Sequence, residues 1–168
     1  NLSSGFGLLV IRAAELAAEG FSAAEIVTKL NQLCSRSHAS FLLDTLEFMK
    51  AGGRCSSIAA FGASVLQLKP CIEVDNQDGS RMHVGKKYRG KMENCLRSYV
   101  KDKLENRRDL DLKRVFITHS GSPAHDIEVV KEEINRYASF ETVHVTRANC
   151  TISSHCGPRT LGVLFMTK

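Results

Sequence analysis

Hydrophobic residues recur at three- and four-residue steps in several segments of the chain, a spacing that predicts amphipathic helices packed on one side. Ser22 and Glu25 form a capping-box pattern at the start of the second segment, and Gly20 ends the first. In the second helix the buried face is expected to comprise Ile26, Val27, Leu30 and Leu33. The predicted helices cover 7–19, a segment after Ser22, a short turn before Gly52, 56–66, 90–105 and a segment after Ser122 and Pro123.

Shorter apolar runs between these helices predict strands. They cover 40–43, 69–75, 81–88, 115–118, 142–146 and 162–166. The Asp78-Gly79 pair between the second and third runs is turn chemistry and predicts an antiparallel hairpin. Because helices also alternate with strands, we expect an α/β fold with a mixed sheet and helices packed on it.

Length and composition favour a single domain over 1–168. Of these 168 residues, 43% are hydrophobic and 24% charged, which is typical of a globular chain able to bury its own core. No apolar run is long enough to cross a bilayer. The chain begins at Asn1 without a methionine or a basic-then-apolar leader, so we expect it to be a piece of a longer protein.

Six cysteines are scattered along the chain without a C-x-x-C pair, which argues against a zinc knuckle or a thioredoxin-type centre. A chain of this length does not need a disulfide framework, so free thiols in a reducing cytoplasm are the preferred interpretation and a disulfide set is the alternative. The six are Cys34, Cys55, Cys71, Cys95, Cys150 and Cys156.

The segment from Leu43 to Arg54 is the most informative stretch of the sequence. An apolar strand runs into a short helix that stops at Gly52-Gly53 and presents Arg54. Two glycines are costly inside a helix, so they cap it or let another group approach the backbone. This pattern suits an anionic head group, and an ordinary helix stop with a solvated arginine is the alternative.

Five motifs together resemble the DegV family, in the family's order and over nearly the whole chain. They are Ser3-Ser4-Gly5-Phe6-Gly7-Leu8-Leu9, Leu43-Asp44-Thr45-Leu46 with Gly52-Gly53-Arg54, Leu68-Lys69-Pro70, Tyr88-Arg89-Gly90-Lys91, and Ser154-His155-Cys156-Gly157-Pro158. The resemblance implies a non-enzymatic carrier that binds a long-chain fatty acid between two α/β domains, without a cofactor, and presents the acyl carboxylate to a fatty-acid kinase. This chain resembles the second, carboxy-terminal domain, and the missing amino-terminal domain would supply hydroxyl groups to the carboxylate.

The resemblance also implies roles for individual residues. Arg54 and His155 belong to the polar network at the ligand head group, and Arg89 docks the partner kinase. An arginine fork and a histidine can both donate hydrogen bonds to a carboxylate or phosphate. The acyl tail needs an apolar lining, for which Ile58, Phe61 and Val65 of the small-residue helix are the natural candidates. Plain core packing of that helix is the alternative.

Two positions depart from the family pattern. Arg159 stands where the family commonly has the last glycine of Gly-Pro-Gly, which places a bulky cation beside His155. Cys55 follows Arg54 where an aliphatic residue is usual. Both departures bear on the geometry of the head-group site. His119, at the carboxyl end of a strand, is interpreted as a loop residue, although ligands often bind at such ends.

Two other classes of protein are compatible with parts of the sequence. The cationic clusters at 81–91 and 101–114, within a net charge of +5, allow a basic nucleic-acid-binding module, but stacking aromatic residues in a recognisable pattern are absent. Serines near His119 and His155 allow a hydrolase, but the sequence has no G-x-S-x-G elbow and no obvious acid partner.

Overall fold

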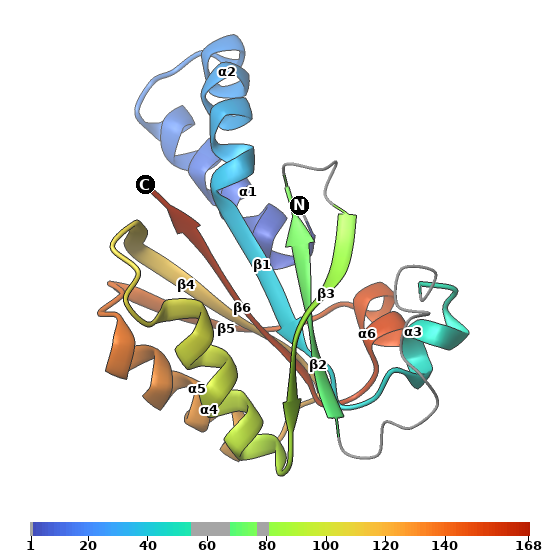
Figure 1. The fold of residues 1–168 in the computed structure, drawn as a ribbon. Coiled ribbons are helices and arrows are strands. Elements are labelled where there is room, and N and C mark those ends of the chain that lie inside the picture. Colours follow the sequence, from blue (N-terminus) through green and yellow to red (C-terminus); the bar gives the residue numbers. More distant parts are fainter. Residues whose placement is uncertain (1, 55–67, 77–80) are drawn as a thin grey trace.

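A computed structural model describes residues 2–54, 68–76 and 81–168, and these form one mixed sheet with helices on both faces (Figure 1). The helices are α1 (Ser4–Ala18), α2 (Ala23–Leu33), the 3-10 turn η1 (Cys34–Arg36), α3 (Glu47–Ala51), α4 (Met92–Leu104), α5 (Ala124–Tyr137) and α6 (Cys150–Cys156). The strands are β1 (Ser37–Leu42), β2 (Leu68–Asp75), β3 (Arg81–Arg89), β4 (Leu110–Ser120), β5 (Thr142–Arg147) and β6 (Thr160–Thr167).

The six strands lie in the order β3-β2-β1-β6-β4-β5. β4 and β5 are parallel, and every other neighbouring pair is antiparallel, so the predicted mixed sheet is confirmed. α5 connects the parallel strands β4 and β5, because a connection between parallel strands must run from one end of the sheet back to the other. The antiparallel β2–β3 hairpin is likewise confirmed.

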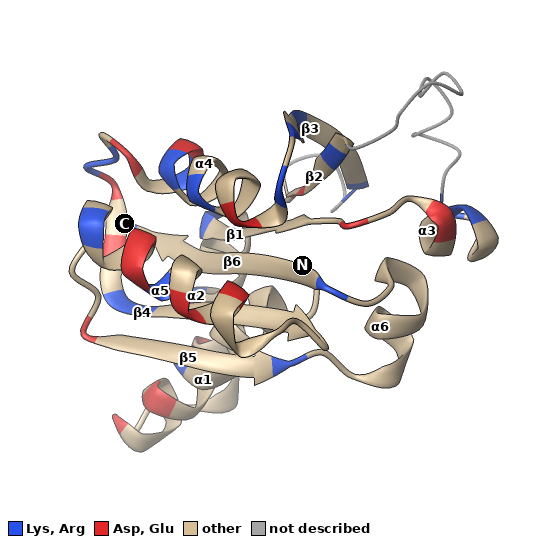
Figure 2. Cartoon of the chain, turned by 90° about the horizontal axis from the view of Figure 1, so that it is seen from below, with Lys and Arg blue, Asp and Glu red and all other residues tan. Residues whose placement is uncertain are grey.

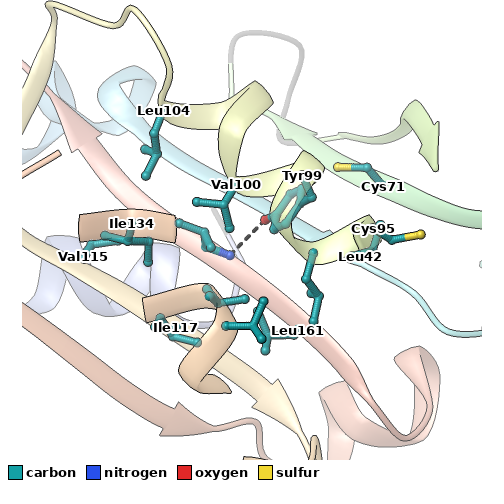
Figure 3. Packing of buried hydrophobic residues seen from close by; sticks show 14 of the residues in the cluster. Leu42, Cys71, Cys95, Tyr99, Val100, Leu104, Val115, Ile117, Ile134 and Leu161 are labelled. Atoms are coloured by element: carbon teal, nitrogen blue, oxygen red, sulfur yellow. Dashed lines mark hydrogen bonds between the residues drawn. The ribbon is translucent and has the colours of Figure 1, made fainter. Parts of the chain in front are cut away.

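α4 and α5 cover one face of the sheet and form the largest hydrophobic cluster with it. The less polar residues that recur at three- and four-residue steps in the predicted 90–105 helix are all buried there: Met92, Cys95, Leu96, Tyr99, Val100 and Leu104. Tyr99 of α4 is fully buried, and its hydroxyl accepts from the Val163 amide and donates to the Ser40 carbonyl, both at 2.9 Å (Figure 3). Ser40 and Val163 face each other across β1 and β6, so the tyrosine hydroxyl bridges two strands from the helix layer.

The opposite face is covered in two parts. α1 packs its Leu8 and Leu9 on Ala39 of β1 and Leu164 of β6. Near the other end of β1, α3 and α6 enclose a smaller cluster of Leu43, Met49, Ile72 and Cys156. Figure 1 shows α3 and α6 side by side and apart from the α1–α2 pair. Among the described residues, no helix is long and apolar enough to span a membrane.

Several sequence-based details are wrong, and each has a local reason. None of the α2 side chains is buried, and Val27 is 58% exposed, because α2 projects from α1 rather than resting on the sheet. α5 begins at Ala124 with Pro123 as its N-cap, since the Ser122 hydroxyl donates to the Thr160 carbonyl instead of capping the helix. The capping box at Ser22 is confirmed.

Other elements differ in extent. α1 starts at Ser4, three residues before the predicted 7–19, and β4 runs from Leu110 to Ser120, well beyond the predicted 115–118. The charged segment before the predicted 115–118 strand is therefore partly strand itself, and its Leu110 and Asp111 pair with β6. α6 was not predicted at all. The proposed helix over 56–66 and the Asp78-Gly79 turn lie outside the described residues.

Candidate functional site

The five motifs of the sequence meet at one end of the sheet, where β1, β3, β4 and β5 finish and β2 and β6 begin; we call it the site end. α3 and α6 lie there, as do the first residues of α1. The β-strand register itself joins two motifs, because Leu68 is paired with Arg89. Segments far apart in the sequence thus lie at the same end of the sheet.

Two glycines allow α3 and α6 to approach closely. A Cβ placed on Gly52 would lie 2.2 Å from Nδ1 of His155, and one placed on Gly157 would lie 2.4 Å from the Phe48 ring. Real Cβ atoms do not approach other atoms so closely, so only glycine fits either position without movement. The Gly-Gly-Arg and His-x-Gly-Pro motifs are therefore two halves of one helix–helix contact.

Arg54 follows this contact and is exposed. Its guanidinium donates to the Gly52 carbonyl at 2.7 Å, and its own amide donates to the Met49 carbonyl at 2.9 Å. Arg54 and His155 consequently touch the same glycine from two directions. The guanidinium makes this hydrogen bond to a neutral oxygen, and within the described residues it forms no salt bridge with a carboxylate.

His155 contributes an unsatisfied polar atom. Its Nδ1 is buried and, within residues 2–54, 68–76 and 81–168, is the one buried side-chain nitrogen or oxygen without a hydrogen-bond partner. A buried unsatisfied polar atom costs about 1–3 kcal/mol, so this nitrogen makes the contact between α6 and the glycine turn an energetically costly one. His155 lies in the last turn of α6, a helix that the sequence analysis did not predict.

A salt bridge holds the segment that leads from β1 into α3. The Lys69 ammonium donates to the Asp44 carbonyl at 2.9 Å and also contacts the Asp44 carboxylate. This pair joins the Leu68-Lys69-Pro70 motif to the segment that follows β1. Lys69 is thus used to fix the backbone that leads into α3, rather than being free to bind a ligand.

An apolar pocket of about 30 Å³ opens between α6, the start of α1 and the sheet at the site end. Its walls expose almost only carbon. They are formed by Leu2, Ser3, Ala39, Ser40, Phe41, Thr118, His119, Ser120, Ala148, Ile152, Thr160, Gly162 and Leu164. The pocket is narrow, which suits a polymethylene segment better than a ring.

Three hydroxyl groups at this pocket satisfy one another. The Thr118 hydroxyl donates to Ser4 Oγ at 2.7 Å and lies 3.0 Å from the Thr146 hydroxyl, which is 3.3 Å from Ser4 Oγ. In a closed ring of three hydroxyls, each hydroxyl donates its one proton to another member of the ring. This ring joins α1, β4 and β5, and it uses the hydroxyl of Thr118, the one member of the three that lines the pocket.

His119 also borders the pocket. Its Nδ1 accepts from the Ser122 amide at 3.1 Å, so in the neutral ring the proton is on Nε2. Burial, reinforced by the positive charge of Arg147, lowers the pKa of His119. The neutral form is therefore favoured. His119 lies within β4, paired with Arg147 of β5 and Leu161 of β6, so its interpretation as a loop residue is wrong, although its ring is bonded to the turn that follows the strand.

Arg89 ends β3 and is exposed, so the structure places it at the site end but not in contact with α3 or α6. Figure 2 shows that charged residues gather on α4, α5 and β3, whereas α6 carries none. In the basic clusters, Lys86 pairs with Asp102, Lys103 with Glu73, Lys101 with Glu105, Arg107 with Asp109, and Lys113 and Arg114 with Glu15. Such neutralised cations do not favour the nucleic-acid alternative.

Of the remaining residues named from the sequence, some lie within the described ranges and others do not. Ile58, Phe61, Val65 and Cys55 lie outside the described residues. The cation of Arg159 is directed to Asp126 on α5, at 2.8 Å, which corrects the expectation that it crowds the His155 site. Burial raises the pKa of the Cys156 thiol to about 11, so this neighbour of His155 stays protonated. In the described ranges, no group of three or more His, Cys, Asp or Glu side chains could hold a metal ion.

Sequence reasoning missed the pocket walls contributed by β1, β6 and α6. Ala39 and Phe41 alternate on one face of β1, and this period-2 pattern was a usable signal. Asn149 was another, because its side chain accepts from the Ile152 amide at 3.0 Å and caps α6. Recognising that cap would have placed His155 and Ile152 on one helix.

The fold and the site define an α/β protein with an apolar pocket beside a cationic helix turn. A family model described as "Uncharacterised protein, DegV family" matches residues 1–168, and the chain belongs to this family. A DegV domain-containing protein of Caldanaerobacter subterraneus subsp. tengcongensis is 31% identical over 174 residues, covering 100% of this chain and 58% of the relative. The chain thus spans little more than half the length of that relative.

Solved structures show the same fold. A structure described as fatty acid binding of a DegV family protein from Thermus thermophilus has a TM-score of 0.80 and 28% identity, covering 99% of this chain and 58% of that one. The Streptococcus pneumoniae Fatty Acid Kinase (Fak) B3 protein loaded with linoleic acid has a TM-score of 0.78 at 14% identity, covering 96% and 55%. The second similarity is one of fold.

Proposed function

We propose that this chain forms part of a carrier that binds a long-chain fatty acid and presents its carboxylate to a fatty-acid kinase. The observation that carries the proposal is the convergence of Arg54 and His155 on Gly52, at the end of the sheet that also carries an apolar pocket, to which α6 contributes Ile152. A cation and an unsatisfied imidazole suit the carboxylate, and the pocket suits the hydrocarbon.

The hydrocarbon supplies most of the affinity in this proposal. Burial of each methylene contributes about 0.8 kcal/mol, whereas the polar contacts mainly set the orientation. The described pocket of about 30 Å³ accommodates only a short part of a long tail. The rest of the tail is assigned to residues beyond this pocket, for which Ile58, Phe61 and Val65 remain candidates.

The site binds and orients a ligand, and no catalytic residue is assigned. Arg54 holds the carboxylate and, after transfer, the acyl phosphate, because its fork of donors matches both groups. The proposal includes a second, amino-terminal domain that supplies hydroxyl groups to the same carboxylate, in keeping with the greater length of the relatives. It also places the protein in the cytoplasm, where its thiols stay reduced.

Kinase docking is assigned to Arg89. It is exposed at the site end and forms no salt bridge in the part of the chain that the structure describes, so it can meet an acidic partner. The Streptococcus pneumoniae protein of this fold, described as a fatty acid kinase B3 protein, supports this part of the proposal.

The proposed function is tested by phosphoryl transfer. A fatty-acid kinase, ATP and oleate are incubated with the protein, and acyl phosphate is measured. Arg54→Ala is expected to lower acyl-phosphate formation at least tenfold, a loss of about 1.4 kcal/mol in binding or presentation, with an unchanged unfolding midpoint. The matched control is Lys131→Ala, which removes an exposed cation on α5. Equal loss in both variants, or none in either, contradicts the proposal.

A further inference from the structure

Arg159 occupies a backbone conformation that normally selects glycine. Its φ is +63°, in the left-handed region, where a non-glycine side chain is disfavoured. Its amide donates to the Ser120 carbonyl at 2.8 Å, so the conformation is held by the end of β4. Such a conformation persists only where surrounding contacts determine it.

Those contacts come from α5. The Arg159 guanidinium donates from Nε to Oδ2 of Asp126 at 2.8 Å and from a terminal nitrogen to Oδ1 at 3.2 Å. The Asp126 side chain is only 3% exposed, whereas that of Arg159 is 41% exposed. A bidentate pair with one buried carboxylate is geometrically specific, unlike most surface ion pairs.

The turn that carries Arg159 connects the two parts of the site. α6, with His155, precedes it, and Thr160, a pocket wall residue, follows it. The Thr160 hydroxyl donates to the Cys156 carbonyl at 2.8 Å, which ties the start of β6 to the end of α6. A displacement of this turn therefore moves His155 and the pocket wall together.

We propose that Arg159 is a positioning residue, which locks the turn after α6 to α5 and thereby holds His155 Nδ1 against Gly52. This ion pair connects the turn to α5, a helix that contributes no residue to the pocket. The Arg159 side chain does not line the pocket and is bonded to Asp126 rather than to Gly52, so it acts through His155. Its effect on ligand affinity rests on the proposed function, whereas its effect on His155 does not.

Two variants open the lock in different ways. Arg159→Gly removes the guanidinium while keeping a residue that accepts φ near +63°, and Asp126→Asn keeps the shape of the buried group but removes its charge. Asn106→Gly is the matched control, since Asn106 also has a positive φ, +61°, in the turn after α4. It tests the effect of glycine at a left-handed position away from the site.

The readout is the ¹⁵N spectrum of the histidine rings without ligand, with His155 assigned from His155→Gln, together with the dissociation constant for oleate. Both lock variants are expected to shift or broaden the His155 ring signals and to weaken oleate binding about tenfold, whereas Asn106→Gly leaves both unchanged. His155 signals that match the parent in Arg159→Gly and Asp126→Asn overturn the inference.

The two possible failures are distinguishable. If the parent protein does not bind oleate but its His155 signals respond to both variants, the proposed function fails and the positioning role stands. If the parent binds oleate and both variants bind it equally well with unaltered His155 signals, the positioning role fails alone. A variant that unfolds by circular dichroism is replaced by the other, because Asp126→Asn and Arg159→Gly remove opposite members of the pair.

Discussion

Nδ1 of His155 lies so close to Gly52 that a Cβ on this glycine would be 2.2 Å away. One relationship therefore joins two motifs that are about a hundred residues apart in the sequence. It also explains why the short helix before Arg54 ends in glycine. The end of α3 contacts α6 at Gly52, and the guanidinium of Arg54 is bonded to this same glycine.

Gly52→Ala is expected to displace His155 and to destabilise the protein by about 1–3 kcal/mol, because overpacking forces neighbouring atoms to shift. Urea unfolding measures the change. Gly7→Ala serves as the control with the opposite sign: a Cβ there meets nothing within 4 Å, and glycine is unfavourable inside a helix. We expect it to stabilise the protein by roughly 0.5–1 kcal/mol. Equal stability of the two variants contradicts this account of the contact.

Tyr99→Phe is expected to lower the free energy of unfolding by about 1–3 kcal/mol, since it leaves the Val163 amide and the Ser40 carbonyl without their buried partner. Tyr88→Phe is the matched variant, because the Tyr88 hydroxyl reaches Asp102 in a partly buried position at 2.8 Å. It should cost less. A Tyr99 variant as stable as the parent would show that the hydroxyl bridge between β1 and β6 does not contribute.

Acidification is expected to destabilise the protein through Glu15. Partial burial alone would raise its pKa, but hydrogen bonds from Arg114, Lys113 and Arg12 outweigh this and lower it to about 2. A carboxylate whose folded pKa lies below its ordinary 4.5 contributes stability that is present above pH 4.5 and is lost as the pH falls toward 2.

Glu15→Gln tests this by comparing urea unfolding at pH 7 and pH 3. The variant should be less stable than the parent at pH 7, and the difference should shrink at pH 3. The same difference at both pH values would mean that Glu15 acts by packing rather than by its charge.

Ala148→Leu is expected to fill the pocket of about 30 Å³ and to weaken oleate binding at least tenfold. Isothermal titration calorimetry measures the affinity. Ala18→Leu, on the exposed last turn of α1, adds the same atoms away from the pocket and should leave the affinity unchanged. Full oleate affinity in Ala148→Leu would exclude this pocket from the ligand path.

The sequence predicted the fold class because apolar periodicity reports burial. On α4 it identified every buried position, since that helix rests flat on the sheet. It failed on α2 because an amphipathic face signals only that a helix can be buried, and Val27 has no strand beneath it. The length of β4 was underestimated because Asp111 pairs with β6 and Arg114 with β5 through their backbone, which side-chain patterns do not show.

The candidate site was predicted unevenly for the same reason. Arg54 and His155 carried chemical signals of their own, and the structure brings both to Gly52. The pocket walls carried none, because Ala39 and Leu164 look like core residues until the three-dimensional arrangement leaves space beside them. The sequence also could not show which group Arg159 contacts, since its partner Asp126 is 33 positions away on another helix.

The most direct test of the central claim is organic extraction and mass spectrometry of the native protein that carries these residues, purified from the organism that makes it. The account predicts that the extract contains long-chain fatty acid at close to one molecule per protein, and that Arg54→Ala retains less of it. A protein that releases no fatty acid and binds none when oleate is added would contradict the account.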